Sequence, residues 1–225
     1  MSSTRAEADR AILKARTPGD ADNTGGEEML RLVQGLFLST SGSVHRGVVF
    51  CGVDRENGSS SVCARAGRTL AAYSSRSVCL VDANLRSPRL SSLLGVETTA
   101  FLRKPVSVRE RCVEIGENLW LAGTGFLADD RGALPSVATL KQHLAELSEV
   151  FEFVLIDAPG AGVSVDAAIL GQIVNGTVLV IDADRTRRIA ARKVKEFLDA
   201  AGVRLLGTVL HNRSFPIPKG LYDKL

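Results

Sequence analysis

Short apolar runs and stretches of helical periodicity alternate along most of this 225-residue chain. The apolar runs are only four to six residues long and contain almost no polar residues. Runs of this kind are typical of parallel strands that are buried on both faces of a sheet. They lie at Val48–Cys51, Val78–Val81, Leu119–Ala122, Phe153–Ile156, Thr177–Ile181 and Leu205–Leu210.

The stretches between these runs have apolar residues every three or four positions, which indicates amphipathic helices. Such stretches lie at Glu27–Leu38, Ser60–Tyr73, Pro135–Leu147 and Thr186–Ala201. Strands that alternate with helices predict an α/β domain with a doubly wound, mostly parallel sheet and helices on both faces. In such domains, ligands bind at the carboxyl ends of the strands.

The chain is predicted to form one folded domain, residues 27–225, preceded by a mobile N-terminal arm, residues 1–26. The arm is rich in small and charged residues, whereas the remainder contains every apolar run of strand length. Hydrophobic residues make up 45% of the chain, which is enough for a sizeable core. Residues 95–117 have the least regular pattern and are predicted to form a crossover or an exposed loop.

Composition excludes several classes of protein. No apolar run approaches the roughly 18 residues of a membrane-spanning helix, and the N-terminus lacks the apolar core of a secretory signal. The four cysteines form no C-x-x-C pair and the three histidines have no ligand spacing, so neither a disulfide framework nor a zinc site is expected. Aromatic residues are not interleaved with the basic ones, which argues against nucleic acid as a partner. A cytoplasmic protein with reduced, buried thiols is the resulting prediction.

Charge is unevenly distributed, although the net charge is only +3. Residues 183–225 contain ten Lys and Arg against four Asp and Glu. Part of this charge lies on the last predicted helix, as Arg187, Arg188, Arg192 and Lys195. The pattern is typical of an ordinary solvated helix face, and also of a surface that binds an acidic partner or an anionic membrane.

The turn after the first apolar run has the position of a phosphate-binding loop. It runs from Gly52 to Ser61 and opens the next predicted helix. In such loops backbone N–H groups and a helix N-terminus surround the phosphates, a Lys follows the last Gly, and a Ser or Thr binds Mg²⁺. Gly58 and Ser60 fit their places, but Ser59 stands where the Lys would be. A tight turn with a serine-rich N-cap explains the same residues.

Two aspartates strengthen the phosphate hypothesis. Asp82 ends the run V-C-L-V-D, and Asp157 ends the run F-V-L-I-D. Because the carboxyl ends of parallel strands meet at one edge of a sheet, both carboxylates are expected to face the loop. Carboxylates in this place suit Mg²⁺ and an attacking nucleophile. We therefore predict Asp82 and Asp157 as catalytic residues, and as Mg²⁺ ligands together with Ser60.

Longer motifs around these aspartates resemble those of the cytoplasmic bacterial tyrosine kinases of capsular and exopolysaccharide synthesis. This family is a branch of the P-loop ATPases related to the Min and Par partition proteins. The resemblance covers roughly residues 27–225. It is strongest in L-V-D-A-N-L-R-S-P-R-L around Asp82, F-V-L-I-D-A-P-G around Asp157, S-V-D-A-A-I-L around Asp166, and F-P-I-P-K-G-L-Y ending at Tyr222.

The resemblance implies a Min/Par-type P-loop fold that uses ATP and Mg²⁺. Glu28 and Arg31 match the family's helix for subunit contacts, which implies a homo-oligomer. Tyr222, the remnant of a C-terminal tyrosine cluster, is the candidate phosphoacceptor. The family docks on the cytoplasmic segment of a membrane-embedded polysaccharide co-polymerase, which implies a cytoplasmic protein peripheral to the inner face of the membrane. The implied cofactor-binding residues are Arg55, Gly58, Ser59, Ser60, Ser61, His211 and Asn212.

Several positions depart from the family pattern in the nucleotide site. The loop Lys is replaced by Ser59, and a Pro and a Gly of the loop are replaced by Arg55 and Glu56. Asn84 replaces the second acid of an Asp-x-Asp pair. His211 stands where an Asn commonly reads adenine. The residues that build the fold are therefore retained, while those that stabilise phosphoryl transfer are depleted.

Loss of a charged Lys–phosphate hydrogen bond removes about 1.5–3 kcal/mol, or about ten- to hundredfold in affinity. Arg55, or a residue of a neighbouring subunit, could compensate in part. We therefore favour a regulatory protein of exopolysaccharide or capsule biosynthesis and export whose nucleotide binding is weak or lost. The alternatives are an active ATP-dependent protein-tyrosine autokinase of the same pathway and a partition-type positioning ATPase. A dehydrogenase is disfavoured because no G-x-G-x-x-G follows the first apolar run.

Overall fold

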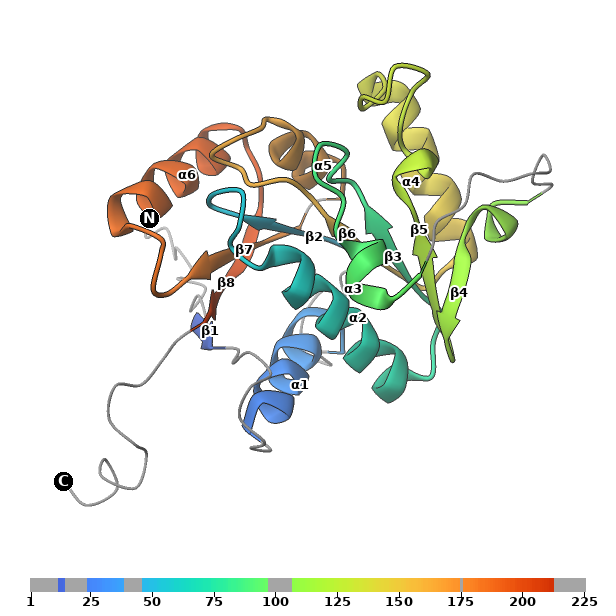
Figure 1. The fold of residues 1–225 in the computed structure, drawn as a ribbon, viewed down its shortest axis with the longest axis horizontal. Helices are drawn as coiled ribbons and strands as arrows, with labels where there is room; N and C mark the ends of the chain where they lie inside the picture. Colours follow the sequence, from blue (N-terminus) through green and yellow to red (C-terminus); the bar gives the residue numbers. More distant parts are fainter. Residues whose placement is uncertain (1–11, 15–23, 39–45, 97–106, 175, 213–225) are drawn as a thin grey trace, which may run out of the picture.

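One mostly parallel sheet organises the molecule (Figure 1). The computed structural model describes residues 12–14, 24–38, 46–96, 107–174 and 176–212. Its eight strands lie in the order β1-β8-β7-β2-β6-β3-β5-β4, and only the β4–β5 pair is antiparallel. The strands are β1 (Ile12–Lys14), β2 (Gly47–Gly52), β3 (Val78–Asp82), β4 (Val113–Gly116), β5 (Leu119–Ala122), β6 (Phe153–Asp157), β7 (Thr177–Asp182) and β8 (Leu205–His211).

Helices cover both faces of this sheet. In Figure 1, α4, α5 and α6 lie on one side, and α1 and α2 lie on the other. The helices are α1 (Thr24–Phe37), α2 (Ser59–Ser74), α3 (Leu90–Leu94), α4 (Val137–Val150), α5 (Asp166–Val174) and α6 (Arg188–Ala200), with 3-10 turns at Arg109–Arg111 and Thr124–Phe126. The doubly wound α/β fold expected from the sequence is confirmed.

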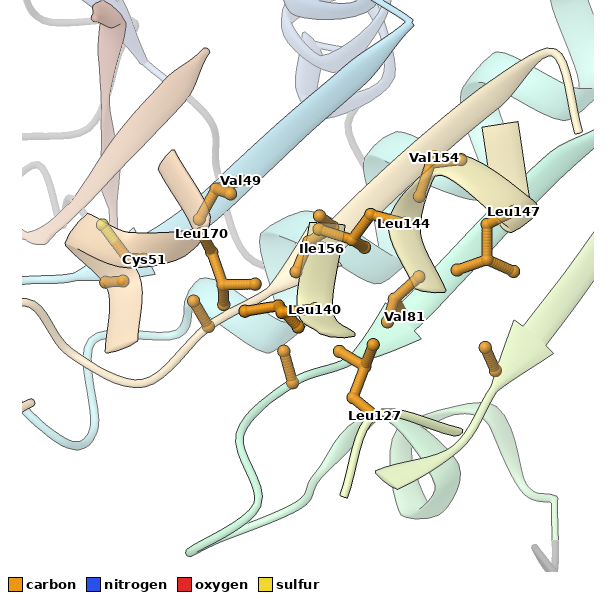
Figure 2. Close-up of a cluster of buried hydrophobic side chains, with 14 of the residues drawn as sticks. Val49, Cys51, Val81, Leu127, Leu140, Leu144, Leu147, Val154, Ile156 and Leu170 are labelled. Atoms are coloured by element: carbon orange, nitrogen blue, oxygen red, sulfur yellow. The ribbon is translucent and has the colours of Figure 1, made fainter. Parts of the chain in front are cut away.

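Side chains of the central strands divide between two hydrophobic cores. In β2, Val49 and Cys51 belong to the core beneath α4, α5 and α6, whereas Val48 and Phe50 belong to the core beneath α1, α2 and α3. Figure 2 shows the first core, where residues of β2, β3 and β6 meet apolar residues of α4 and α5. Burial on both faces explains why these strands read as continuous apolar runs rather than alternating ones.

Every strand expected from an apolar run is present, with bounds that differ by one residue at most. The prediction of a crossover or loop over residues 95–117 is wrong at β4, since Val113–Gly116 forms an edge strand antiparallel to β5. In this strand half-buried residues alternate with exposed ones. A strand of four residues is too short for this alternation to be recognised in the sequence. The remainder of that stretch between residues 97 and 106 lies outside the described residues.

The structure describes parts of the predicted N-terminal arm, residues 1–26. Ile12–Lys14 pairs with β8, and α1 begins at Thr24. Within the described ranges, every helix is too short or too polar to span a bilayer.

The order of the central strands creates the candidate site. β6 lies between β2 and β3, and Asp82 at the end of β3 is in register with Asp157 at the end of β6. The loop that follows β2 is therefore adjacent to both aspartates, at the edge where doubly wound folds bind ligands.

Candidate phosphate-binding site

The loop between β2 and α2 ends in a glycine with a left-handed backbone. Gly58 is the N-cap of α2 and has φ 74° and ψ 15°. A Cβ atom at this position would overlap the imidazole ring of His211, which lies directly against it. Both the dihedral angle and the close approach therefore require glycine here. The first turn of α2 then presents its backbone N–H groups at the carboxyl edge of the sheet, as an anion site requires.

Asn57 fixes the conformation of this loop. The residue is only 3% exposed. Its Oδ1 atom accepts a hydrogen bond from the backbone N–H of Asp54, and its Nδ2 atom donates to Thr186 Oγ1 at 2.7 Å. Gly160, after β6, approaches the Asp54 carbonyl so closely that a Cβ would overlap it. The loop is thus attached to the segments that follow β6 and β7.

The serines at the start of α2 lie over Asp157. Ser59 Oγ donates a hydrogen bond to Asp157 Oδ1 at 3.4 Å, and Ser60 is buried beside it. The other carboxylate oxygen, Oδ2, is buried and has no hydrogen-bond partner among the described residues. A buried oxygen without a hydrogen-bond partner in the protein is expected where a ligand or cation is to be held.

The surroundings of the two aspartates raise the pKa of both carboxyl groups. Burial raises the pKa of Asp157 to about 7, the nearby Asp82 carboxylate adds to the increase, and the Ser60 and Ser59 hydroxyls oppose it. Burial also raises the pKa of Asp82 to about 6, opposed by backbone N–H groups. Two of these donors are Asn84 N at 3.3 Å and Leu90 N at 3.2 Å. Two adjacent buried carboxylates create a region of negative charge that a bound cation would stabilise.

A pocket of about 220 Å³ opens over this edge. Its volume is below the roughly 300 Å³ of typical small-molecule pockets, so it suits the phosphate end of a nucleotide rather than the whole molecule. Three of its side chains are arginines from three different loops. The lining residues are Arg55, Glu56, Gly58, Ser59, Ser60, Ser61, Asn84, Arg89, Leu93, Arg185 and Asn212.

Two of these arginines are paired with the loop glutamate. Arg89 Nη2 lies 3.3 Å from Glu56 Oε1, and Arg185 Nη1 lies 3.7 Å from Glu56 Oε2. The Glu56 side chain is 61% exposed. Two of the three cationic groups of the pocket are therefore supplied by the loops after β3 and β7, and a carboxylate of the phosphate loop bridges these two.

The far side of the site is built around Asp182 at the end of β7. Its oxygens accept hydrogen bonds from Asp184 N and Arg185 N at 3.1 Å and from Asn212 Nδ2 at 3.0 Å. His211 is buried, and desolvation lowers its pKa. These bonds fix the loop that carries Arg185 and the strand end that carries Asn212.

The donor set fits the phosphates and the Mg²⁺ that the fold family implies. Hydroxyl and carboxylate oxygens are the ligands that Mg²⁺ prefers, and Asp157 Oδ2 is available to it. The described residues contain no group of three or more His, Cys, Asp or Glu side chains arranged around a metal. A Mg²⁺ ion at Ser60 and the aspartates would therefore share its coordination with water and phosphate oxygens, as is usual for this metal.

Most of the predicted site residues are brought together by the fold. Asp82 and Asp157 lie in register beneath the loop, and six of the seven predicted cofactor residues line one pocket. His211 is the exception, because its imidazole packs behind Gly58 and does not line the pocket. The candidate phosphoacceptor Tyr222 lies outside the described residues.

The predicted oligomer contacts lie on α1, away from this site. Arg31 is exposed and pairs with Glu27 at 4.0 Å. Glu28 turns inward, with its Oε2 atom buried and its charge acting on Arg65 of α2. Of the two residues, Arg31 is exposed, whereas Glu28 is only partly exposed.

Sequence reasoning missed Asn57, Arg89, Arg185 and Asp182. Asp182 and Arg185 follow the fifth apolar run, so the strand-end rule that identified Asp82 also applied to them. Arg89 stands within the run L-V-D-A-N-L-R-S-P-R-L. No local signal indicates that it meets Glu56, because the contact joins residues 33 positions apart.

Comparison with known proteins identifies the relatives of this chain. No family model matches it. Tyrosine-protein kinase YwqD of Bacillus subtilis is 27% identical over 187 residues, which cover 76% of this chain and 79% of that protein. Tyrosine-protein kinase CpsD of Streptococcus agalactiae is 31% identical over 93 residues, and the match spans 41% of each protein. The kinase domain of the Escherichia coli tyrosine kinase ETK has a TM-score of 0.68 and 17% identity, covering 90% of this chain and 81% of that one.

The chain is a homologue of the bacterial tyrosine-protein kinases. The family resemblance found in the sequence is thereby confirmed. The kinase domain of ETK, at its low identity, shows that the P-loop kinase fold is shared. In this chain Ser59 follows Gly58, the last glycine of the candidate phosphate loop.

Proposed function

We propose that this chain is a cytoplasmic regulatory protein of exopolysaccharide or capsule biosynthesis and export that binds nucleotide weakly. The observation that carries the proposal is the position of Ser59. Its hydroxyl occupies the place of the loop Lys and donates to Asp157 instead of facing a phosphate as a cation. The kinase homologues and the oxygen-lined pocket support ATP with Mg²⁺ as the ligand.

The remaining donors support positioning of phosphates more than their transfer. The first turn of α2 supplies backbone N–H groups and Ser60 supplies a hydroxyl, while Asp157 supplies a carboxylate oxygen for Mg²⁺ rather than for a phosphate. Phosphoryl transfer depends on cations placed at the oxygens where charge develops, and loss of one such donor typically costs about 10²–10³ in rate. A protein with this site is better suited to signal nucleotide occupancy to a partner than to phosphorylate it.

The test is a calorimetric titration of the full chain with Mg·ATP, repeated with Ser59→Lys. We expect the variant to gain about ten- to hundredfold in affinity. Ser61→Lys, which adds the same charge to the same pocket at another place, is the matched control and should gain less. If the unmodified chain binds at micromolar concentration and incorporates phosphate at Tyr222, the active tyrosine autokinase is the correct function instead.

A membrane-embedded polysaccharide co-polymerase is the proposed partner, contacted through its cytoplasmic segment. The proposed contact surface consists of three exposed arginines at the start of α6, namely Arg187 at its N-cap, Arg188 and Arg192. Lys195 is excluded from it, because it pairs with Asp199 on the same helix. Charge reversal at Arg188 and Arg192 is expected to abolish co-purification with the partner, and retention of the partner would refute this surface.

Homo-oligomerisation through α1 is also proposed. Arg31 is the side chain to test because it is exposed, whereas Glu28 contributes to the packing of α1 on α2. We expect Arg31→Ala to reduce the oligomer size measured by light scattering. An unchanged size would exclude α1 as the contact helix.

A further inference from the structure

Glu56, Arg89 and Arg185 form a cluster of charged side chains beside the phosphate loop. Each residue belongs to a different loop, after β2, β3 and β7 respectively, and all three line the pocket over the buried aspartates. The two guanidinium groups approach opposite oxygens of one carboxylate, at 3.3 Å and 3.7 Å. A planar carboxylate held between two guanidinium groups has the same recognition chemistry as a phosphate oxygen pair.

We propose that Arg89 and Arg185 are the phosphate-binding cations of this chain, and that Glu56 occupies them as an internal carboxylate which an oligophosphate displaces. The proposal rests on the proposed function, since it names the groups that retain phosphate after loss of the loop Lys. Glu56, a residue of the phosphate loop, therefore competes with phosphate for the two arginines.

Arg89 is held in place by the buried part of the site. Asp82 accepts hydrogen bonds from the backbone N–H groups of Asn84 and Leu90, which fix the two ends of the loop that carries Arg89. The positive charge of Arg89 also acts on Asp157. Arg89 thus lies between the exposed Glu56 and the buried aspartates, where the phosphate end of a nucleotide bound to the loop would be.

Arg185 is positioned in a similar way from the other side. Its backbone N–H donates to Asp182 at 3.1 Å, and Thr186 beside it accepts a hydrogen bond from Asn57. The loop after β7 is therefore attached to the phosphate loop. Both arginines are presented by fixed backbone, while their side chains are 53% and 71% exposed and can exchange partners.

Displacement of Glu56 is feasible because exposed ion pairs contribute little to stability. A triphosphate offers more negative charge than one carboxylate, and it also receives the backbone N–H groups at the start of α2. Glu56 therefore lowers the affinity for phosphate without preventing binding.

The experiment is calorimetric titration of the full chain with Mg²⁺ and inorganic tripolyphosphate, at concentrations up to about 10 mM. We expect Glu56→Gln to bind about 5–20-fold more tightly than the unmodified chain, and Arg89→Gln and Arg185→Gln to bind about 5–10-fold more weakly. Equal affinity of Glu56→Gln and the unmodified chain, or no binding by either, would overturn the proposal. Thermal melting of each variant verifies that it is folded.

A second cluster in the chain provides the matched controls. Glu152 is bridged by Arg46 at 3.6 Å and by Arg76 at 3.9 Å, at the opposite edge of the sheet. Glu152→Gln and Arg46→Gln make the same changes of charge away from the pocket and should leave tripolyphosphate affinity unchanged. If they shift it as much as the site variants do, general electrostatics explains the result and the proposal fails.

One further variant and one further ligand test whether the guanidinium geometry and the phosphate groups determine the affinity. Arg89→Lys keeps the charge but loses the two-pronged geometry, and should bind with intermediate affinity. Mg·ADP in place of tripolyphosphate should respond to the same variants in the same order. The proposed function fails separately, when the unmodified chain binds Mg·ATP at micromolar concentration and labels Tyr222, whichever way the Glu56 variant behaves.

Discussion

The same ion-pair arrangement occurs at both ends of the parallel strands, which we call the carboxyl edge and the amino edge of the sheet. The surroundings of the two arrangements differ. At the carboxyl edge, Glu56 bridges Arg89 and Arg185 above two buried carboxylates and a pocket. At the amino edge, Glu152 bridges Arg46 and Arg76. Both glutamates connect loops that are distant in sequence. Near the first of them lies Asp157 Oδ2, a buried oxygen with no hydrogen-bond partner among the described residues.

Hydrogen bonds within the protein pair the groups around Glu152 at the amino edge. Val154 N donates to the carbonyl of Arg46, Phe153 N donates to the carbonyl of Ser77, and Glu152 N donates to Ser77 Oγ. Glu152 is also less exposed than Glu56, at 32% against 61%. We therefore interpret Glu152 as a structural bridge between paired segments, in contrast to the competitor role proposed for Glu56.

Removal of the buried charge of Asp157 at the carboxyl edge is expected to have the largest effect on the free energy of unfolding. The pKa of Asp157 rises from 3.8 to about 7 on folding, so the folded state holds the proton more tightly than the unfolded state. The stabilisation from this group is complete below about pH 4 and is lost as the pH rises to about 7. Asp157→Asn should therefore raise the free energy of unfolding at pH 8 by on the order of 2–4 kcal/mol, and by much less at pH 4, in urea denaturation.

Asp182→Asn is the control for this prediction. Asp182 is as buried as Asp157, but its oxygens accept three hydrogen bonds, so its replacement should reduce stability. If Asp157→Asn is also destabilising at pH 8, the carboxyl edge is not held in an electrostatically unfavourable state, and the contrast between the two edges is lost.

Gly58→Ala tests how tightly the carboxyl edge is packed. The substitution combines a positive φ with overlap of the His211 ring, and should cost about 2–3 kcal/mol in thermal unfolding. Gly95→Ala has a similar φ of 70° with no atom within 4 Å, and should cost only about 1 kcal/mol. Equal losses would show that His211 moves freely and does not fix the loop.

The smallest of these expected effects is the difference in the free energy of unfolding between the Gln variants of the two bridging glutamates. Glu152→Gln is expected to lower the free energy of unfolding by about 0.5–1 kcal/mol, because a half-buried carboxylate loses two guanidinium partners. Glu56→Gln should change it by less than about 0.5 kcal/mol, because that cluster is more exposed. Chemical denaturation of both variants at low salt measures the difference, and a larger loss for Glu56→Gln would reverse their assigned roles.

The fold and half of the site follow from local patterns. Strands buried on both faces leave uninterrupted apolar runs, and Asp82 and Asp157 follow from where two of those runs end. Arg89, Arg185 and Asn57 do not follow, because their partners depend on how three loops are placed after folding. The family resemblance places His211 where an Asn commonly reads adenine, but its ring packs against Gly58, and that contact depends on the dihedral angle of the glycine.

Amide NMR of the full chain during titration with Mg·ADP tests most directly whether the carboxyl edge is a weakened phosphate site. We predict shifts confined to the phosphate loop around Gly58 and Ser60 and to the loops of Arg89 and Arg185, saturating with a dissociation constant of roughly 0.1–1 mM. Amides near Glu152 should not move. Absence of shifts at the phosphate loop at about 10 mM nucleotide, or larger shifts at the amino edge, would contradict the proposed site.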